Sequence, residues 1–114
     1  MLLIVESPGQ RQARPDPEGQ MLYQRMVEWS ADLEARGLVV MGESLKPHRE
    51  SVRVRLRDGK RSLVDGPFAE AKEMIGGFFL LRCETKDQAV AIASECPAAA
   101  WATVEVRELG ACSA

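Results

Sequence analysis

The sequence predicts an α+β fold in which two helices cover one face of an antiparallel sheet with an inserted β-hairpin. Two stretches have helical apolar periodicity, and short strand-like runs surround them. Their order along the chain is β-α-β-β(-β)-β-α-β. Because the chain has 114 residues and 46% of them are hydrophobic, we expect one domain over residues 1–114 with its own core.

The first two elements are a strand and a long helix. The apolar run over residues 2–6 predicts the strand. Asp16 and Pro17 have the form of a helix start, with Asp16 as the cap. Gly37 is the expected stop, so the helix should run to about Arg36. Apolar residues at three- and four-residue steps predict its buried face: Leu22, Met26, Trp29 and Leu33.

Four further strands are predicted in the middle of the chain. Residues 38–41 form an apolar run, and residues 52–57 alternate apolar side chains with arginines, which predicts a half-buried strand. Asp58-Gly59 is a strong hairpin turn, after which residues 61–65 return as the partner strand. Residues 76–82 are almost wholly apolar, so this strand should be central in the sheet.

The last helix and strand complete the pattern. Residues 85–88 match a capping box and open a helix that Pro97 ends. Its expected inner face consists of small and apolar residues: Ala89, Ile92, Ala93 and Cys96. Residues 101–108 form the final strand. Without the hairpin, this order is the split β-α-β pattern of a ferredoxin-like sandwich.

One face of this sheet has no predicted cover within the chain. Two helices protect the other face, and the strands hold too much apolar residue for an exposed surface. The simplest solution is a homodimer packed sheet to sheet. Such packing would place clefts between the subunits.

Composition excludes several classes of protein. The net charge of −2, from 15 basic and 17 acidic residues, argues against a general nucleic-acid binder. The arginines of residues 53–61 lack interleaved aromatic residues, so we interpret them as a solvated strand face. No stretch is long enough to span a membrane, and the N-terminus lacks the basic region of a signal peptide.

The cysteines and the histidine suggest neither a metal site nor a cofactor. The three cysteines are Cys83, Cys96 and Cys112, an odd number without a Cys-x-x-Cys pair. We therefore expect reduced thiols in a cytoplasmic protein. The single histidine, His48, has no partner pair for metal binding and is expected in an exposed loop.

The segment from Val64 to Leu81 holds the strongest candidates for a site. Asp65 precedes Gly66-Pro67, and its carboxylate can either form an Asx turn or act as a general acid or base at a cleft. Phe68 would supply an apolar wall. Glu70 and Lys72 would lie near the rim, although Lys72 beside acids is also a simple solvated charge pair. Glu43, at the end of a strand, is a further candidate for lining the cleft.

Several of these residues resemble the signature of a known family. Residues 65–70 (Asp-Gly-Pro-Phe-Ala-Glu), Gly76-Gly77-Phe78 and Cys96-Pro97-Ala98 are similar to the YCII-related (DGPF) domain family, and the resemblance covers nearly the whole chain. It implies a bacterial protein with a dimeric ferredoxin-like α/β barrel. Members are often encoded beside extracytoplasmic-function sigma factors, which implies a regulatory role.

The resemblance transfers only part of a proposed catalytic site. In better-characterised relatives a His-Asp pair in a cleft is proposed as an acid/base site, and the wider family includes a dehydrochlorinase of chlorinated aromatics. That histidine lies on the first helix. This chain has no histidine between Gln20 and Arg36, where Tyr23 and Met26 stand instead. Asp65 alone therefore carries over as a catalytic candidate.

Three hypotheses follow. The leading one is a small cytoplasmic homodimer that binds a small molecule in an intersubunit cleft, with a regulatory role linked to a sigma factor. Its ligand-binding candidates are Phe68, Glu70, Lys72, Tyr23 and Glu43. The second is a lyase- or hydrolase-like enzyme that uses Asp65, aided by Tyr23 or Glu43. The third is a protein-interaction module that contacts a sigma factor through the basic hairpin.

Overall fold

The computed structural model describes residues 1–112 and has an α+β fold with two helices and antiparallel sheets, consistent with a ferredoxin-like arrangement. The strands are β1 (Leu2–Glu6), β2 (Val39–Ser44), β3 (Val52–Arg57), β4 (Lys60–Asp65), β5 (Met74–Leu81) and β6 (Thr103–Val106). The helices are α1 (Asp16–Ala35) and α2 (Lys86–Glu95), and two 3-10 turns are η1 (His48–Glu50) and η2 (Pro97–Ala100).

Four strands form the main sheet in the order β2-β5-β1-β6, and each neighbouring pair is antiparallel. The apolar strand β5 is central, as its composition predicts. Leu2 pairs with Phe79 on one side and with Val106 on the other, so these three side chains share a face. The register of β1 and β5 shifts between Ile4 and Val5. This bulge lies beside the polar end of β1.

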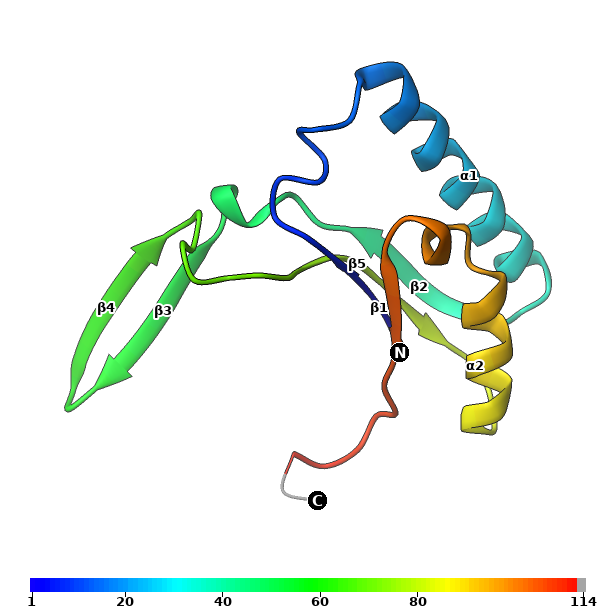
Figure 1. Cartoon of the computed structure of the whole chain (residues 1–114). Coiled ribbons are helices and arrows are strands. Elements are labelled where there is room, and N and C mark those ends of the chain that lie inside the picture. Colours follow the sequence, from blue (N-terminus) through cyan, green and yellow to red (C-terminus); the bar gives the residue numbers. More distant parts are fainter. Residues whose placement is uncertain (113–114) are drawn as a thin grey trace.

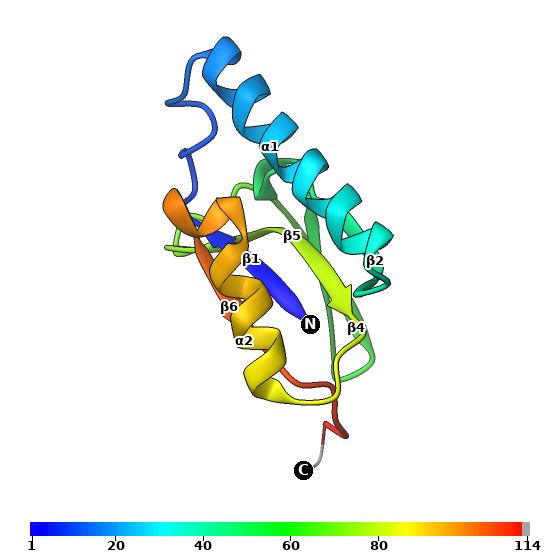
Figure 2. The ribbon, with the colours of Figure 1, turned by 90° about the vertical axis from the view of Figure 1, so that its right-hand side faces the viewer.

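Both helices cover the same face of the sheet (Figures 1 and 2). The core between them consists of Leu2, Ile4, Leu33, Phe79, Ile92, Ala93, Cys96 and Ala98. Trp29 packs edge-on against Phe79, with ring centroids 5.1 Å apart. The apolar stripes predicted for the two helices are therefore confirmed as their inner faces.

The helix ends agree only in part with the sequence patterns. Thr85 caps α2, because its Oγ1 accepts a hydrogen bond of 3.1 Å from the backbone N–H of Gln88. The prediction that Asp16 caps α1 is wrong, since Pro15 occupies the cap position and no side chain bonds there. Asp16 lies inside the first turn instead, where a carboxylate interacts favourably with the helix dipole.

Two strands also differ in length from the prediction. Strand β2 continues to Ser44, because Glu43 and Ser44 pair with Phe78 and Gly77 of β5. Strand β6 is shorter than residues 101–108, since η2 and Trp101 turn before it begins. The extension of β2 brings its last residues beside the start of α1.

The face of the main sheet opposite the helices has an apolar centre flanked by acidic residues of β2 and β6, and we call it the open face. Leu3 pairs with Phe78 and Met41 pairs with Leu80, on the side away from the core. Met41 is 47% exposed, and the other three are half-buried. Neither α1 nor α2 covers this face, since both lie on the other side of the sheet (Figure 1).

Strands β3 and β4 pair only with each other and form a separate hairpin. We call residues 52–65 the arm. All twelve of its strand residues are exposed, so the prediction of a half-buried strand over residues 52–57 is wrong for the single chain. Figure 1 shows the arm projecting away from the sheet and helices. The radius of gyration is accordingly 16.1 Å, against about 13 Å for a compact chain of this length.

Candidate ligand-binding site

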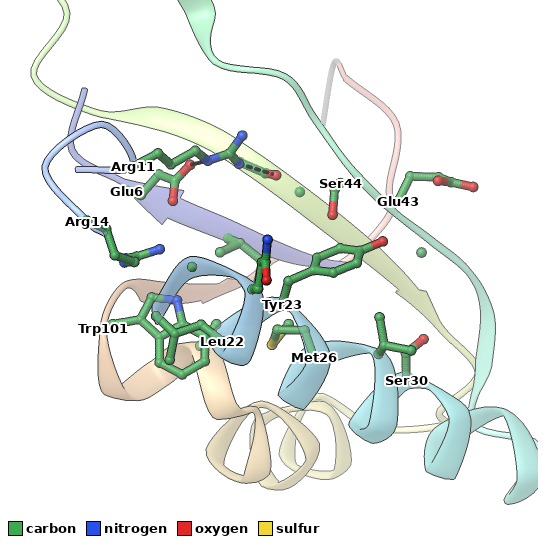
Figure 3. Close-up of a pocket in the computed structure, with 18 of the residues that line it drawn as sticks. Glu6, Arg11, Arg14, Leu22, Tyr23, Met26, Ser30, Glu43, Ser44 and Trp101 are labelled. Atoms are coloured by element: carbon green, nitrogen blue, oxygen red, sulfur yellow. Dashed lines mark hydrogen bonds and ion pairs between the residues drawn. The ribbon is translucent and has the colours of Figure 1, made fainter. Parts of the chain in front are cut away.

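A cavity of about 580 Å³ lies between α1 and the helix-facing side of the main sheet (Figure 3). Its position follows from the fold, because the first half of α1 stands over the ends of β2 and β5 beside the bulge in β1. The apolar part of its lining comes from the core and from α1: Ile4, Leu22, Met26, Phe79 and Trp101. The polar part includes two arginines, three acids and several neutral residues: Arg11, Arg14, Glu6, Asp16, Glu43, Gln20, Tyr23, Ser30 and Ser44.

An ion pair between Glu6 and Arg11 forms one wall of the cavity. The Nε atom of Arg11 lies 2.6 Å from Oε1 of Glu6, whose side chain is only 6% exposed. The contact lacks hydrogen-bond geometry, and Oε1 accepts no hydrogen bond within residues 1–112. Arg11 also donates to two backbone oxygens, those of Leu45 at 2.6 Å and Gly76 at 2.9 Å. The charge of Arg11 is thus directed to protein groups.

Gly76 provides the space for this ion pair. A Cβ atom at Gly76 would overlap Oε1 of Glu6 and Nη2 of Arg11. The backbone of Gly76 has no positive φ, so the requirement for glycine is steric. The Gly-Gly pair that resembles a family signature therefore has a local reason here, which is close approach of a buried ion pair to the central strand.

Arg14 is the second cation of the cavity, and it differs from Arg11. Its guanidinium makes no ion pair or hydrogen bond with residues 1–112. The side chain is half-buried at the N-terminal end of α1. Asp16 lines the same end but is exposed in the first helical turn. Arg14 is therefore a free positive group at the mouth of an apolar cavity.

Two residues predicted as ligand contacts, Tyr23 and Glu43, line this cavity. Tyr23 is 60% exposed, and its ring extends from α1 toward β2 (Figure 3). Glu43 pairs with Phe78, and its carboxylate points away from Tyr23 in Figure 3. Ser44 follows it on β2. Tyr23 is thus the better placed of the two for contact with a ligand.

The other predicted site residues lie elsewhere. Asp65, Glu70 and Lys72 are exposed and do not line the cavity. The side chain of Asp65 makes no hydrogen bond within residues 1–112, so no Asx turn forms there. The turn is held instead by the backbone N–H of Gly66, which donates to the oxygen of Ser51 at 2.8 Å. The catalytic role of Asp65 stays a prediction, and the single chain does not bring it to the cavity.

Phe68 lies at the base of the arm. Its ring meets that of His48 edge-on, with centroids 5.6 Å apart, and the guanidinium of Arg53 lies 3.7 Å from its centroid. Cation–π and edge-on contacts of this kind each contribute roughly 1 kcal/mol. Phe68 therefore anchors the arm to the loop that carries His48, a role distinct from the predicted wall of a cleft.

The structure gives no sign of metal or thiol chemistry within residues 1–112. No group of three or more His, Cys, Asp or Glu residues in this part of the chain could hold a metal ion. The cysteines are free, and burial raises the pKa of the Cys96 thiol, although hydrogen bonds from Ala98 and Ala99 oppose this. A raised pKa makes Cys96 a poor nucleophile. No helix in these residues is long and apolar enough to cross a membrane.

Sequence reasoning missed the residues that define the cavity: Glu6, Arg11, Arg14 and Trp101. Glu6 had a detectable signal, because it is an acid directly after the four apolar residues of β1. Arg11 and Arg14 stand in an irregular loop with no periodicity, so only the folded chain shows where their side chains go.

Comparison with known proteins identifies the family. The family model of the YCII-related domain matches residues 1–111, and the chain belongs to this family. A stretch of 51 residues is 37% identical to the uncharacterized protein R00369 of Rhizobium meliloti (strain 1021). That stretch covers 45% of this chain and 41% of the relative, so less than half of the relative's length is matched. The resemblance to the YCII-related domain family is therefore confirmed.

Proposed function

We propose that this protein binds a small organic anion with an apolar body in the cavity under α1. The observation that carries the proposal is the free guanidinium of Arg14 at the mouth of a 580 Å³ cavity. Ligand pockets commonly measure about 300–1,000 Å³ and combine apolar walls with a few polar groups. This cavity has both features.

The negative charge of the proposed ligand follows from the charged residues around the cavity. The charges of Glu6 and Arg11 neutralise each other. The two Nη atoms of Arg11 donate hydrogen bonds to the backbone oxygens of Leu45 and Gly76. Arg14 is left without a partner, and a guanidinium presents paired donors that match a carboxylate. Asp16 and Glu43 also line the cavity, but both are exposed to solvent, so each opposes an anion only weakly.

The apolar body of the proposed ligand follows from the residues of the cavity walls. Phe79 and Trp101 supply aromatic surface, and Tyr23 supplies an aromatic ring at the exposed side. Aromatic walls favour flat apolar bodies through stacking and edge-on contact. The hydroxyls of Tyr23 and Ser44 are available to hydrogen-bond polar substituents on such a body.

We also propose that the protein is a homodimer packed through its open face. The exposed or half-buried Leu3, Met41, Phe78 and Leu80 support this, because a contiguous apolar sheet face is unfavourable in water. The regulatory role, the sigma-factor partner and the cytoplasmic location stay predictions. The enzyme that uses Asp65 also stays a prediction, because Asp65 does not line the cavity of the single chain.

Isothermal titration with matched probes tests the binding proposal. We expect naphthalene-2-carboxylate to bind more tightly than neutral 2-acetylnaphthalene, since only the former pairs with Arg14. Arg14→Ala should weaken naphthalene-2-carboxylate binding by about tenfold or more, because a charge-assisted hydrogen bond contributes about 1.5–3 kcal/mol. Arg25→Ala is the matched control on an exposed face of α1. Equal binding of both probes, or equal effects of both variants, would contradict the proposal.

A further inference from the structure

The arm has an apolar face that nothing in residues 1–112 covers. The register of the hairpin places Val54 opposite Leu63, with Val52 and Leu56 on the same face. Val54 is 62% exposed and Leu56 is 64% exposed. The other face is mainly basic, and the apolar face has charged residues only at its two ends, Arg61 near the turn and Asp65 at the base. The alternation is the pattern of a strand with one buried face, yet the chain itself provides no burial.

A hairpin of this kind is poorly stable alone. Two strands without a third strand or a packed helix are marginal in water at best. The base of the arm is nevertheless well tied, by Phe68 between His48 and Arg53 and by the hydrogen bond from Gly66 to Ser51. These contacts at the base fix the direction of the arm. The apolar face of the arm therefore needs a partner surface.

Charge favours a second copy of this chain as that partner. The arm holds five basic and two acidic residues, a net charge of +3. Because the whole chain has a net charge of −2, the rest of it carries −5. A second copy therefore always presents a body of opposite charge to the arm. Complementary charge of this kind steers association and sets register.

The direction of the arm agrees with this partner. The arm leaves the sheet between β2 and β5, which are neighbours, and both views show it on the side away from the helices (Figures 1 and 2). That is the side of the open face. A copy packed on the open face would thus lie next to the arm, and a twofold axis would make the contact reciprocal.

We propose that the arm packs its apolar face against the body of a second copy, so that two copies exchange arms. The inference rests on the homodimer proposed above and deepens it. The exchange gives each of Val52, Val54, Leu56 and Leu63 the burial that the alternation predicts.

Light scattering of the full chain tests the exchange first. The wild type should have about twice the chain mass of 12.6 kDa. Val54→Asp should weaken the dimer by about tenfold or more, because it would bury an unpaired carboxylate. Ser62→Asp adds the same charge on the opposite face and should change dimerisation by less than about threefold. Equal effects of the two variants, or none, would overturn the arm exchange.

A photo-cross-link tests the contact directly and does not depend on the variants. Benzoylphenylalanine replaces Leu56 in a mixture of ¹⁴N- and ¹⁵N-labelled chains. We expect mixed-isotope peptides that join residue 56 of one chain to the body of the other. Cross-links only within one chain, or only between two arms, would overturn the proposal.

The homodimer and the arm exchange can be tested separately. A dimer that Val54→Asp leaves intact overturns the arm exchange and keeps the homodimer. A wild type that is monomeric at every concentration overturns both of these. Neither result changes the titration of the cavity with naphthalene-2-carboxylate, because the cavity lies within one chain.

Discussion

Glu6 and Arg11 form the most buried ion pair of the structure's described residues, with Nε 2.6 Å from Oε1. The other ion pairs within residues 1–112 join side chains that are at least 41% exposed. A carboxylate as buried as Glu6 needs a fixed cation beside it. The pair therefore holds the loop after β1 against β5 and shapes one wall of the cavity.

Arg11→Ala should lower the free energy of unfolding by about 3 kcal/mol, because it leaves the Glu6 carboxylate buried without a cation. The double variant Glu6→Gln with Arg11→Ala should recover part of this loss. Arg36→Ala is the control, since its ion pairs with Asp32 and Glu95 are exposed, and it should cost about 0.5 kcal/mol. Urea unfolding measures all three. A loss for Arg11→Ala as small as the control would contradict this account of the pair.

Gly76→Ala should lower stability by about 2 kcal/mol, because the new methyl group would overlap both side chains of the ion pair. It should also weaken binding of naphthalene-2-carboxylate, since the displaced Arg11 would move into the cavity. Gly110→Ala is the control, because nothing lies within 4 Å of a Cβ atom there. Thermal unfolding compares the two variants. An unchanged midpoint for Gly76→Ala would mean that the wall of the cavity adjusts freely.

Asp65→Ala should change the free energy of unfolding by less than about 0.5 kcal/mol, as for other exposed residues without partners. It should leave binding of naphthalene-2-carboxylate unchanged, because Asp65 does not line the cavity. Calorimetry and titration of the same sample measure both quantities. Loss of binding without loss of stability would restore Asp65 as a site residue, at a cleft that only the assembled protein forms.

Cys96 should react with iodoacetamide far more slowly than the exposed Cys112 at pH 8, because burial raises its pKa and shields the sulfur. The raised pKa also has a consequence for stability. Burial of the neutral thiol contributes fully to the free energy of unfolding below the unfolded pKa of 9.0. This contribution falls as the pH rises above 9.0, toward the raised pKa of the folded state. Mass spectrometry of the labelled native protein measures the rates. Similar rates for Cys96 and Cys112 would show that the core is open at η2.

Most of the fold was predictable from local sequence patterns, because burial of apolar residues and capping of helix ends produce those patterns. The stripe from Leu22 to Leu33 and the apolar run of β5 can be satisfied only by burial, and Thr85 caps whatever helix follows it. The burial of β3 was not predictable for the single chain. Its alternating pattern specifies a buried face without specifying whose surface covers it.

The candidate site was less predictable than the fold. Tyr23 was found because it stands where the resembled family has a histidine, and Glu43 because it ends a strand; both line the cavity. Arg14 was missed because a half-buried arginine in an irregular loop has no sequence periodicity. The charged cluster around Asp65 attracted attention through its composition. In the structure, Phe68 of this cluster holds the base of the arm through its contacts with His48 and Arg53.

The most direct test of the central claim is an NMR titration of the ¹⁵N-labelled protein with naphthalene-2-carboxylate. We expect the largest shift changes at the glycine amides that line the cavity: Gly19, Gly42, Gly76 and Gly77. Gly59 in the turn of the arm and Gly110 near the C-terminus should not move. Shift changes confined to the arm or the open face, or none at millimolar probe, would contradict a ligand site under α1.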